Sequence, residues 1–270
     1  MNIEKVAVIG AGVMGASIAA HIANAGIPVD LLDVVPKQSD NRNAIAEGAI
    51  AKLLKTDPQP FMHPKNARLL TPGNIEDDLG KLAQADWVIE AVIENPAIKQ
   101  ALYQQLAAVC RPDTLISSNT STLPLSILTR NQPDSFKRRF MITHFFNPPR
   151  YMRLLELVAP PELNADLLKT VSAFADIKLG KGCVLCNDTP GFIANRIGTF
   201  WIQTALLEAI AQNLAVEQCD AAMTLFGIPK TGVFGLLDLV GLDLMPHVLE
   251  SFKQTVLIRL SHTSTRYSGT

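Results

Sequence analysis

The chain has 270 residues, of which 48% are hydrophobic and 18% are charged, and its formal net charge is -1. Such a chain can bury a large core and form one large or two modest domains. Because its charges balance, no long-range attraction draws it to nucleic acid or to an acidic membrane surface. Its longest apolar stretch, residues 192–216, is interrupted by Arg196 and Glu208, so no membrane span is expected. We find no signal peptide and expect a cytoplasmic protein.

Short apolar segments alternate with amphipathic ones as far as residue 186. Strands are expected, in chain order, at residues 6–9, 28–32, 87–92, 114–117, 140–143, 154–158 and 184–186. Helices are expected at residues 13–25, 43–55, 98–109, 125–129 and 165–175. The proline-rich passage between residues 58 and 72 is interpreted mostly as loop. This order predicts an α/β fold with a mostly parallel sheet covered by helices on both faces.

The composition changes after Thr189, Pro190 and Gly191, where strand patterns give way to helical ones. Helices are expected at residues 192–213, 216–225 and 236–252. From residue 255 onward the apolar periodicity fades, which indicates a tail or a shortened chain. We therefore place a domain boundary near Asp188, with an α/β domain at residues 1–187 and a smaller, incomplete all-α domain at residues 188–270.

A glycine-rich turn follows the first expected strand and opens the first expected helix. Residues 10–15, Gly-Ala-Gly-Val-Met-Gly, fit the pattern GxGxxG, which in this position predicts a Rossmann-like, doubly wound dinucleotide-binding domain. The glycines allow a tight turn and a close approach of the pyrophosphate to the positive end of the helix. The candidate cofactor-binding residues of this turn are Gly10, Gly12, Val13, Met14 and Gly15.

An acidic residue ends the second expected strand. Asp33 is placed to accept hydrogen bonds from an adenosine ribose and to repel a 2'-phosphate, so NAD is favoured over NADP, although Lys37 lies nearby. FAD uses the same fingerprint, but no later segment suggests a flavin domain.

A histidine and a carboxylate lie on two consecutive extended segments. His144 begins the run His-Phe-Phe-Asn-Pro-Pro, and Glu156 follows in the next expected strand. Histidine exchanges protons near neutral pH, and an adjacent carboxylate can orient its ring. Together with a nicotinamide that takes a hydride, this pair predicts the oxidation of an alcohol. Cys183 and Cys186 form CxxC, but on a strand they point to opposite faces, so no metal site is expected.

Two polar segments complete the candidate site. Residues 117–122, Ser-Ser-Asn-Thr-Ser-Thr, should expose hydroxyl groups and an amide at the carboxyl edge of the sheet, where ligands of this fold bind. Residues 188–196 mark the entry into the helical region, with Asn195 on the first turns facing the crevice. A packing role for Asn195 is an alternative.

These segments together resemble the L-3-hydroxyacyl-CoA dehydrogenase family of fatty acid β-oxidation, and the resemblance covers residues 3–244. The motifs occur in the family's order, as residues 10–15, 90–94, 118–121, 144–148 with Glu156, and 188–196. The resemblance is greatest to long bacterial multidomain members, in which a hydratase module accompanies the dehydrogenase. It implies oxidation of (S)-3-hydroxyacyl-CoA by NAD, and a homodimer through the helical domain is a further possibility.

The resemblance also implies roles for single residues. His144 would be the general base, and Glu156 would orient its ring. Ser121 and Asn195 would hydrogen-bond the substrate's 3-oxygen and thioester region. Further family positions near the nicotinamide ribose and the reacting centre are Glu94, Lys99 and Asn147. The CoA arm is harder to place, and the candidates are Lys52 and Lys55.

Two alternatives remain open on the sequence. One is a related NAD-dependent sugar-acid dehydrogenase of the kind that resembles lens lambda-crystallin, although Phe145 and Phe146 suit an acyl chain better. The other is an NAD-binding protein without catalytic activity, because the helical domain is short.

Overall fold

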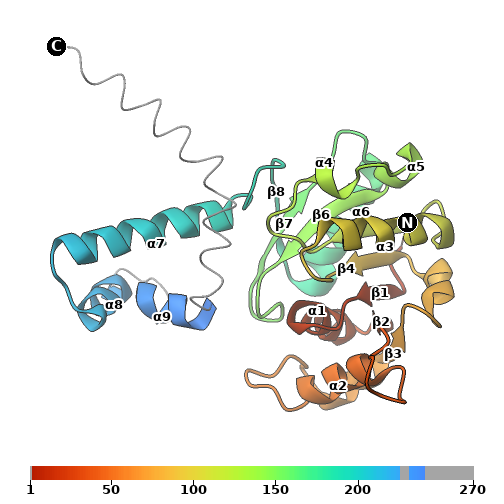
Figure 1. Ribbon diagram of the computed structural model, residues 1–270, viewed down its shortest axis with the longest axis horizontal. Coiled ribbons are helices and arrows are strands. Elements are labelled where there is room, and N and C mark those ends of the chain that lie inside the picture. The colour runs from red at the N-terminus through yellow and green to blue at the C-terminus, as the bar shows by residue number, and fades with distance from the viewer. Residues whose placement is uncertain (1, 226–230, 241–270) are drawn as a thin grey trace, which may run out of the picture. The chain divides into compact units, whose positions relative to one another are not determined.

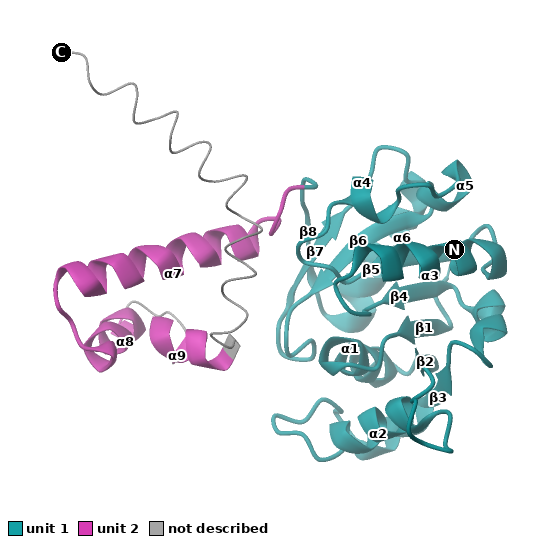
Figure 2. Cartoon of the chain, in the orientation of Figure 1, with its two compact units in different colours: residues 1–188 teal, residues 189–270 magenta. Residues whose placement is uncertain are grey.

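The computed structural model describes residues 2–225 and 231–240. The chain divides into two compact units, residues 1–188 and residues 189–270 (Figure 2). Within the described residues no helix is long and apolar enough to cross a membrane.

The first unit is built on one sheet of eight strands in the order β3-β2-β1-β4-β5-β6-β7-β8 (Figure 1). The strands are β1 (Val6–Ile9), β2 (Val29–Asp33), β3 (Leu70–Asn74), β4 (Trp87–Glu90), β5 (Leu115–Ser118), β6 (Phe140–Phe145), β7 (Leu154–Val158) and β8 (Gly182–Leu185). The helices are α1 (Val13–Asn24), α2 (Ala44–Leu53), α3 (Pro96–Val109), α4 (Leu125–Leu128), α5 (Asp134–Lys137) and α6 (Ala165–Leu179), with short 3-10 turns η1 (Pro64–Leu69) and η2 (Leu79–Gln84). This is the predicted doubly wound, Rossmann-like arrangement.

Aromatic side chains pack the helices onto both faces of the sheet. Trp87 of β4 meets Phe174 of α6 edge-on, with ring centroids 6.1 Å apart. Tyr103 of α3 packs on Phe140 of β6, with ring centroids 4.9 Å apart. Because neighbouring residues of a strand point to opposite faces, these contacts bury large apolar surfaces on the two sides of the sheet.

The sheet departs from the sequence analysis at two strands. β7 pairs with β6 in the antiparallel direction, because residues 146–153 are too few for the crossover of about a dozen residues that a parallel neighbour needs. β3 lies in the passage interpreted as loop. It contains Pro72, which an edge strand tolerates because one side of its backbone has no ladder partner.

The second unit consists of helices α7 (Ala194–Ala211), α8 (Val216–Leu225) and α9 (Gly232–Val240). Its small core joins Ile202 and Ala205 of α7 to Val233 and Leu237 of α9. The Asp220 carboxylate accepts hydrogen bonds from the first backbone N–H groups of α9, at Phe234 and Gly235. The predicted helix at 236–252 thus begins earlier, at Gly232. Residues 241–252 of the predicted helix and the predicted tail lie outside the described residues.

Candidate active site

The three glycines of the turn after β1 have different surroundings. Gly10 has a φ of +100°, and a Cβ there would lie 2.5 Å from the Ala91 carbonyl oxygen. A Cβ at Gly15 would lie 1.8 Å from the Gly10 carbonyl oxygen, so α1 packs directly on the turn. A Cβ at Gly12 would meet nothing within 4 Å. Gly10 and Gly15 therefore allow neighbouring backbone segments of the protein to approach closely. Gly12, in contrast, leaves room for a ligand to reach the backbone.

The helix that follows this turn presents its amino end without a side-chain cap. Gly12 is the N-cap residue, the first turn holds no acidic residue, and Val13 is exposed while Met14 is half-buried. The first backbone N–H groups of α1 and its dipole are thus suited to a phosphate.

Asp33 is held against the same turn by backbone groups. Its Oδ2 accepts a hydrogen bond from the Ala11 N–H at 2.5 Å, and its Oδ1 accepts one from Val34 N–H at 2.7 Å. Each carboxylate oxygen keeps lone-pair capacity for a ribose hydroxyl.

An apolar cavity of about 510 Å³ opens beside Asp33. Its lining includes Gly10 and Gly12 of the turn and the side chains of Ile75, Ile98 and Leu102. A flat base with polar edges fits such a cavity, with its ribose at Asp33 and its phosphates at Gly12. The residues present therefore suit NAD.

His144 and Glu156 are opposite each other in the β6–β7 pair. The His144 ring nitrogen Nδ1 lies 2.8 Å from Oε2 of Glu156, and the two residues are 7% and 1% exposed. The Phe146 ring packs against the imidazole, with centroids 4.5 Å apart. The antiparallel direction of β7 is what brings this carboxylate to the imidazole. Strand β6 is longer than expected and includes His144 near its carboxyl end, at the sheet edge that also carries the glycine turn.

The polar run at residues 117–122 is only partly exposed, which corrects the sequence analysis. Ser117 and Ser118 are the last residues of β5 and are fully buried. Ser121 lies beyond the strand and is half-buried. Between them, the Asn119 side chain accepts a hydrogen bond from the Phe145 N–H at 2.9 Å. The loop is thus fixed to the strand that carries His144, and the hydroxyl-bearing residues of the run that are only half-buried are Ser121 and Thr122.

Glu94 and Lys99 form an ion pair behind the glycine turn. The Lys99 ammonium lies 3.3 Å from Glu94 and 2.6 Å from Glu90, and Lys99 is 1% exposed. Glu94 is exposed, so it is the member of this group that a ligand can touch. Glu94 and Lys99 were expected near the reacting centre, whereas Glu90 was not, although its position inside the motif at 90–94 was an available signal.

The other predicted residues lie at the margin of this group or outside it. Asn147 is exposed in the turn after β6, at a cis peptide bond with Pro148. Lys52 and Lys55 are exposed at the end of α2 and just after it. Asn195 is in the first turn of α7 and belongs to the second compact unit.

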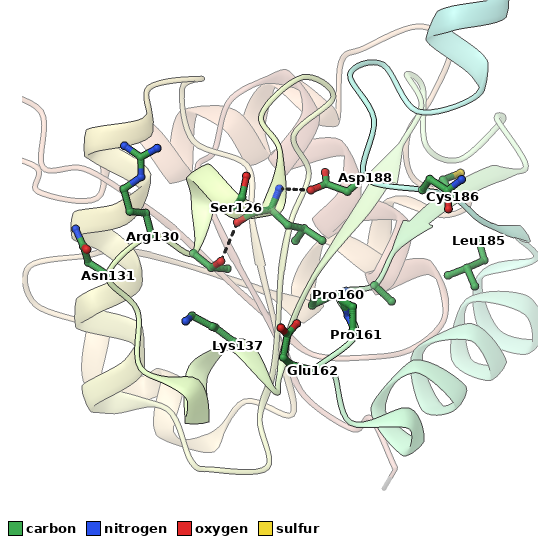
Figure 3. A pocket seen from close by; sticks show the side chains of 14 residues that line it. Ser126, Arg130, Asn131, Lys137, Pro160, Pro161, Glu162, Leu185, Cys186 and Asp188 are labelled. Atoms are coloured by element: carbon green, nitrogen blue, oxygen red, sulfur yellow. Dashed lines mark hydrogen bonds between the residues drawn. The ribbon is translucent and has the colours of Figure 1, made fainter. Parts of the chain in front are cut away.

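A second cavity of the first unit, of about 690 Å³, is lined by residues of α4 and of the segments that follow α4, β7 and β8 (Figure 3). Asp188 accepts a hydrogen bond from Leu125 N–H at 3.0 Å, and burial raises the pKa of its carboxyl group. Arg130, Lys137 and Glu162 also line this cavity. Neither His144 nor the glycine turn is among the lining residues, so this cavity is separate from the candidate site.

Comparison with known families covers both units. Residues 5–189 match the family described as 3-hydroxyacyl-CoA dehydrogenase, NAD binding domain, and residues 191–265 match the 3-hydroxyacyl-CoA dehydrogenase, C-terminal domain.

Several relatives can be aligned with most of this chain. A putative fatty acid oxidation complex trifunctional enzyme of Rickettsia felis is 47% identical over 93% of this chain and 35% of its own length. A probable 3-hydroxyacyl-CoA dehydrogenase of Deinococcus radiodurans is 44% identical over 92% of this chain and 72% of its own length. The chain thus spans only about a third of the length of several relatives it matches.

Solved structures show the same architecture. FadB2 of M. tuberculosis is 28% identical, with a TM-score of 0.79 over 98% of this chain and 95% of its own. The 3-hydroxybutyryl-CoA dehydrogenase of Escherichia coli is 31% identical, with a TM-score of 0.76 over 94% of this chain and 53% of its own. The glycine turn, the histidine–carboxylate pair and these matches agree, and the chain belongs to the 3-hydroxyacyl-CoA dehydrogenase family.

Proposed function

We propose that the chain oxidises (S)-3-hydroxyacyl-CoA to 3-ketoacyl-CoA with NAD, and that His144 is the general base. The observation that carries this proposal is the buried pair of His144 and Glu156, 2.8 Å apart, at the sheet edge that also holds the glycine turn. The family match to an NAD-binding domain supports the choice of cofactor.

The residues around His144 suit the removal of a proton from an alcohol. Because Nδ1 faces Glu156, Nε2 is the nitrogen that takes the proton of the substrate hydroxyl. The carboxylate orients the ring and stabilises the positive charge that the imidazole gains. Phe146 packs against the ring and limits its motion. A positioned base of this kind contributes about 10²- to 10⁴-fold in rate. When bound, NAD would supply the acceptor for the hydride that leaves the carbon bearing this hydroxyl.

The neighbouring polar residues are assigned to substrate and cofactor as part of the same proposal. Ser121 donates a hydrogen bond to the substrate's 3-oxygen, which its half-buried place beyond β5 supports. Glu94 and Asn147, both exposed, contact the nicotinamide side of the cofactor, and Lys99 holds Glu94 in place. Lys52 and Lys55 are assigned to the phosphates of the CoA arm. Asn195 remains a prediction from the family resemblance.

The helical unit supports a proposed homodimer. One side of α7 exposes apolar residues at helical spacing, including Phe200 at 69% and Ile210 at 76% exposure. A stripe of this kind is typical of an interface with another protein surface. Sedimentation of the protein with Phe200→Glu, compared with wild type, tests this assignment; a wild-type monomer would contradict it. A cytoplasmic location is also part of the proposal and has the sequence alone as support.

The decisive experiment is loss of NADH absorbance on addition of acetoacetyl-CoA, followed by a chain-length series of 3-ketoacyl thioesters. We expect turnover with the thioesters and none with a sugar acid tested in the oxidative direction with NAD. Turnover with the sugar acid alone would favour the sugar-acid dehydrogenase instead. Calorimetric binding of NAD without any turnover would show a binding protein that lacks catalytic activity.

A further inference from the structure

Glu90, the last residue of β4, is a carboxylate with 0% exposure. Its Oε1 accepts hydrogen bonds from Lys99 Nζ at 2.6 Å and from the Val92 N–H at 2.7 Å. Its Oε2 accepts hydrogen bonds from the Tyr103 hydroxyl at 2.5 Å and from the Ser118 hydroxyl at 2.7 Å. These donors replace the water that the carboxylate loses on burial, and the lysine balances its charge.

Lys99 and Tyr103 are on α3, whereas the other two partners of Glu90 lie at the beginnings of two loops that leave neighbouring strands of the sheet. Val92 lies in the loop at residues 91–95, which follows β4. Ser118 is the last residue before the loop at residues 119–122, and its hydroxyl also accepts a hydrogen bond from Thr120 N–H at 3.3 Å. A backbone hydrogen bond also connects the two strand ends, because the Asn119 N–H donates to the Glu90 carbonyl at 2.8 Å. One residue therefore anchors the beginning of both loops.

Each loop reaches a different part of the candidate site. The loop at 91–95 packs on the glycine turn, where a Cβ on Gly10 would touch the Ala91 carbonyl, and it carries Glu94. The loop at 119–122 carries Ser121, and its Asn119 is bonded to Phe145 beside His144. On the proposed function, the first loop contacts the cofactor and the second contacts the substrate.

We propose that Glu90 is a positioning residue that couples these two loops, so that NAD and the acyl thioester bind cooperatively. A ligand that orders one loop also orders the other through the shared carboxylate. The binding of the second ligand then costs less conformational entropy, because its loop is already ordered. The inference rests on the proposed function, which supplies the two ligands. By thermodynamic linkage, NAD lowers the Kd of the thioester by the same factor by which the thioester lowers the Kd of NAD. Such factors are typically about 5- to 150-fold.

Two consecutive serines offer a matched pair of variants. Ser117 and Ser118 are both fully buried in β5 and point to opposite faces of the sheet. The Ser118 hydroxyl binds Glu90, whereas the Ser117 hydroxyl binds the Trp87 indole and the Thr143 hydroxyl. Ser118→Ala therefore removes one donor from Glu90, and Ser117→Ala removes an equally buried hydroxyl that contacts neither loop.

The experiment is titration calorimetry of the full chain with acetoacetyl-CoA, with and without saturating NAD. Both ligands are in the oxidised form, so no hydride transfer disturbs the measurement. In the wild type and in Ser117→Ala, we expect NAD to lower the Kd of acetoacetyl-CoA severalfold. In Ser118→Ala, we expect this factor to fall toward one, with a thermal midpoint close to that of Ser117→Ala.

Several outcomes would overturn the inference. The first is a Ser118→Ala variant in which NAD lowers the Kd of acetoacetyl-CoA by the same factor as in the wild type. The second is a Ser117→Ala variant in which this factor falls as much as in Ser118→Ala. A wild-type protein that binds both ligands with a factor of one would also overturn it and leave the proposed function intact. A wild-type protein that binds neither ligand would overturn both.

A second variant guards against a folding defect in Ser118→Ala. Tyr103→Phe removes another donor from the same oxygen of Glu90 and creates no cavity, because only the hydroxyl is lost. We expect it to reduce the factor in the same direction. A Tyr103→Phe protein with the full wild-type factor would contradict the role of Glu90.

Discussion

Two buried histidines of the first unit differ in what lies beside the ring. His144 on β6 is 7% exposed and faces the Glu156 carboxylate. His21 on α1 is 4% exposed, and its ring lies beside the backbone of Leu179 and the Lys181 ammonium rather than beside a carboxylate. Burial, the largest cause, and the nearby Lys181 ammonium together lower the pKa of His21 to about 4.

The comparison separates a base from a packing residue. A histidine that cannot hold a proton in the folded chain cannot serve as a base near neutral pH, and His21 is such a residue. His144, by contrast, has the Glu156 carboxylate at hydrogen-bond distance, which orients its ring. Burial is common to both sites, so the partner of the ring is what distinguishes them.

The largest effect should follow from His144→Gln. Removal of the base should reduce kcat for NADH oxidation with acetoacetyl-CoA by about 10²- to 10⁴-fold. The Kd of NADH, measured by its fluorescence, should change little because His144 is not among the residues that line the cavity beside Asp33. His21→Gln is the control and should retain its turnover.

Glu156→Gln should also reduce kcat, by about 10²-fold, because an amide can bond the ring without stabilising its positive charge. The binding of NADH should again be unchanged. A loss of turnover that followed a loss of NADH binding would instead indicate a general disruption of the sheet edge.

The lowered pKa of the buried His21 should make the stability of the protein depend on pH. Its pKa is near 6.5 in the unfolded chain and about 4 in the folded chain, so the unfolded state binds the proton more readily between these values. The free energy of unfolding should therefore fall as the pH drops from 6.5 toward 4, by about 3 kcal/mol from this residue. Urea unfolding of His21→Leu should show a correspondingly smaller fall; an equal fall in both proteins would exclude His21 as a cause.

The smallest effect should be the influence of Lys181 on the pKa of His21. The Lys181 ammonium donates hydrogen bonds to the carbonyls of Pro149 and Met152, and burial lowers its own pKa to about 8. Lys181→Met should raise the pKa of His21 by less than burial lowers it, because the charge of Lys181 is the weaker cause. NMR titration of the imidazole resonances measures this change. Lys178→Met removes an exposed charge from the end of α6 and should leave the pKa of His21 unaltered.

Local patterns were sufficient to predict most of the first unit. The alternating elements, the glycine turn with Asp33 and the pairing of His144 with Glu156 all follow from short stretches of sequence. Helix α8 was predicted at its observed bounds. These features depend on periodicity and on turn chemistry that neighbouring residues determine.

Features that depend on the whole sheet could not be predicted in the same way. Strand β3 was missed because its proline is acceptable only at an edge, and the edge is known only once the strand order is known. Ser118 was expected to be exposed because nothing near it in sequence shows that Glu90 lies within reach. His21 lies in an apolar helix, and its surroundings come from Lys181, far along the chain.

The most direct test of the central claim is rescue of His144→Ala by free imidazole in the NADH assay with acetoacetyl-CoA. If an imidazole braced by Glu156 exchanges the proton, the variant should be almost inactive alone and should regain turnover in proportion to added imidazole. The double variant His144→Ala/Glu156→Gln should regain much less. A His144→Ala protein that turns over at nearly the wild-type rate without imidazole would contradict the account.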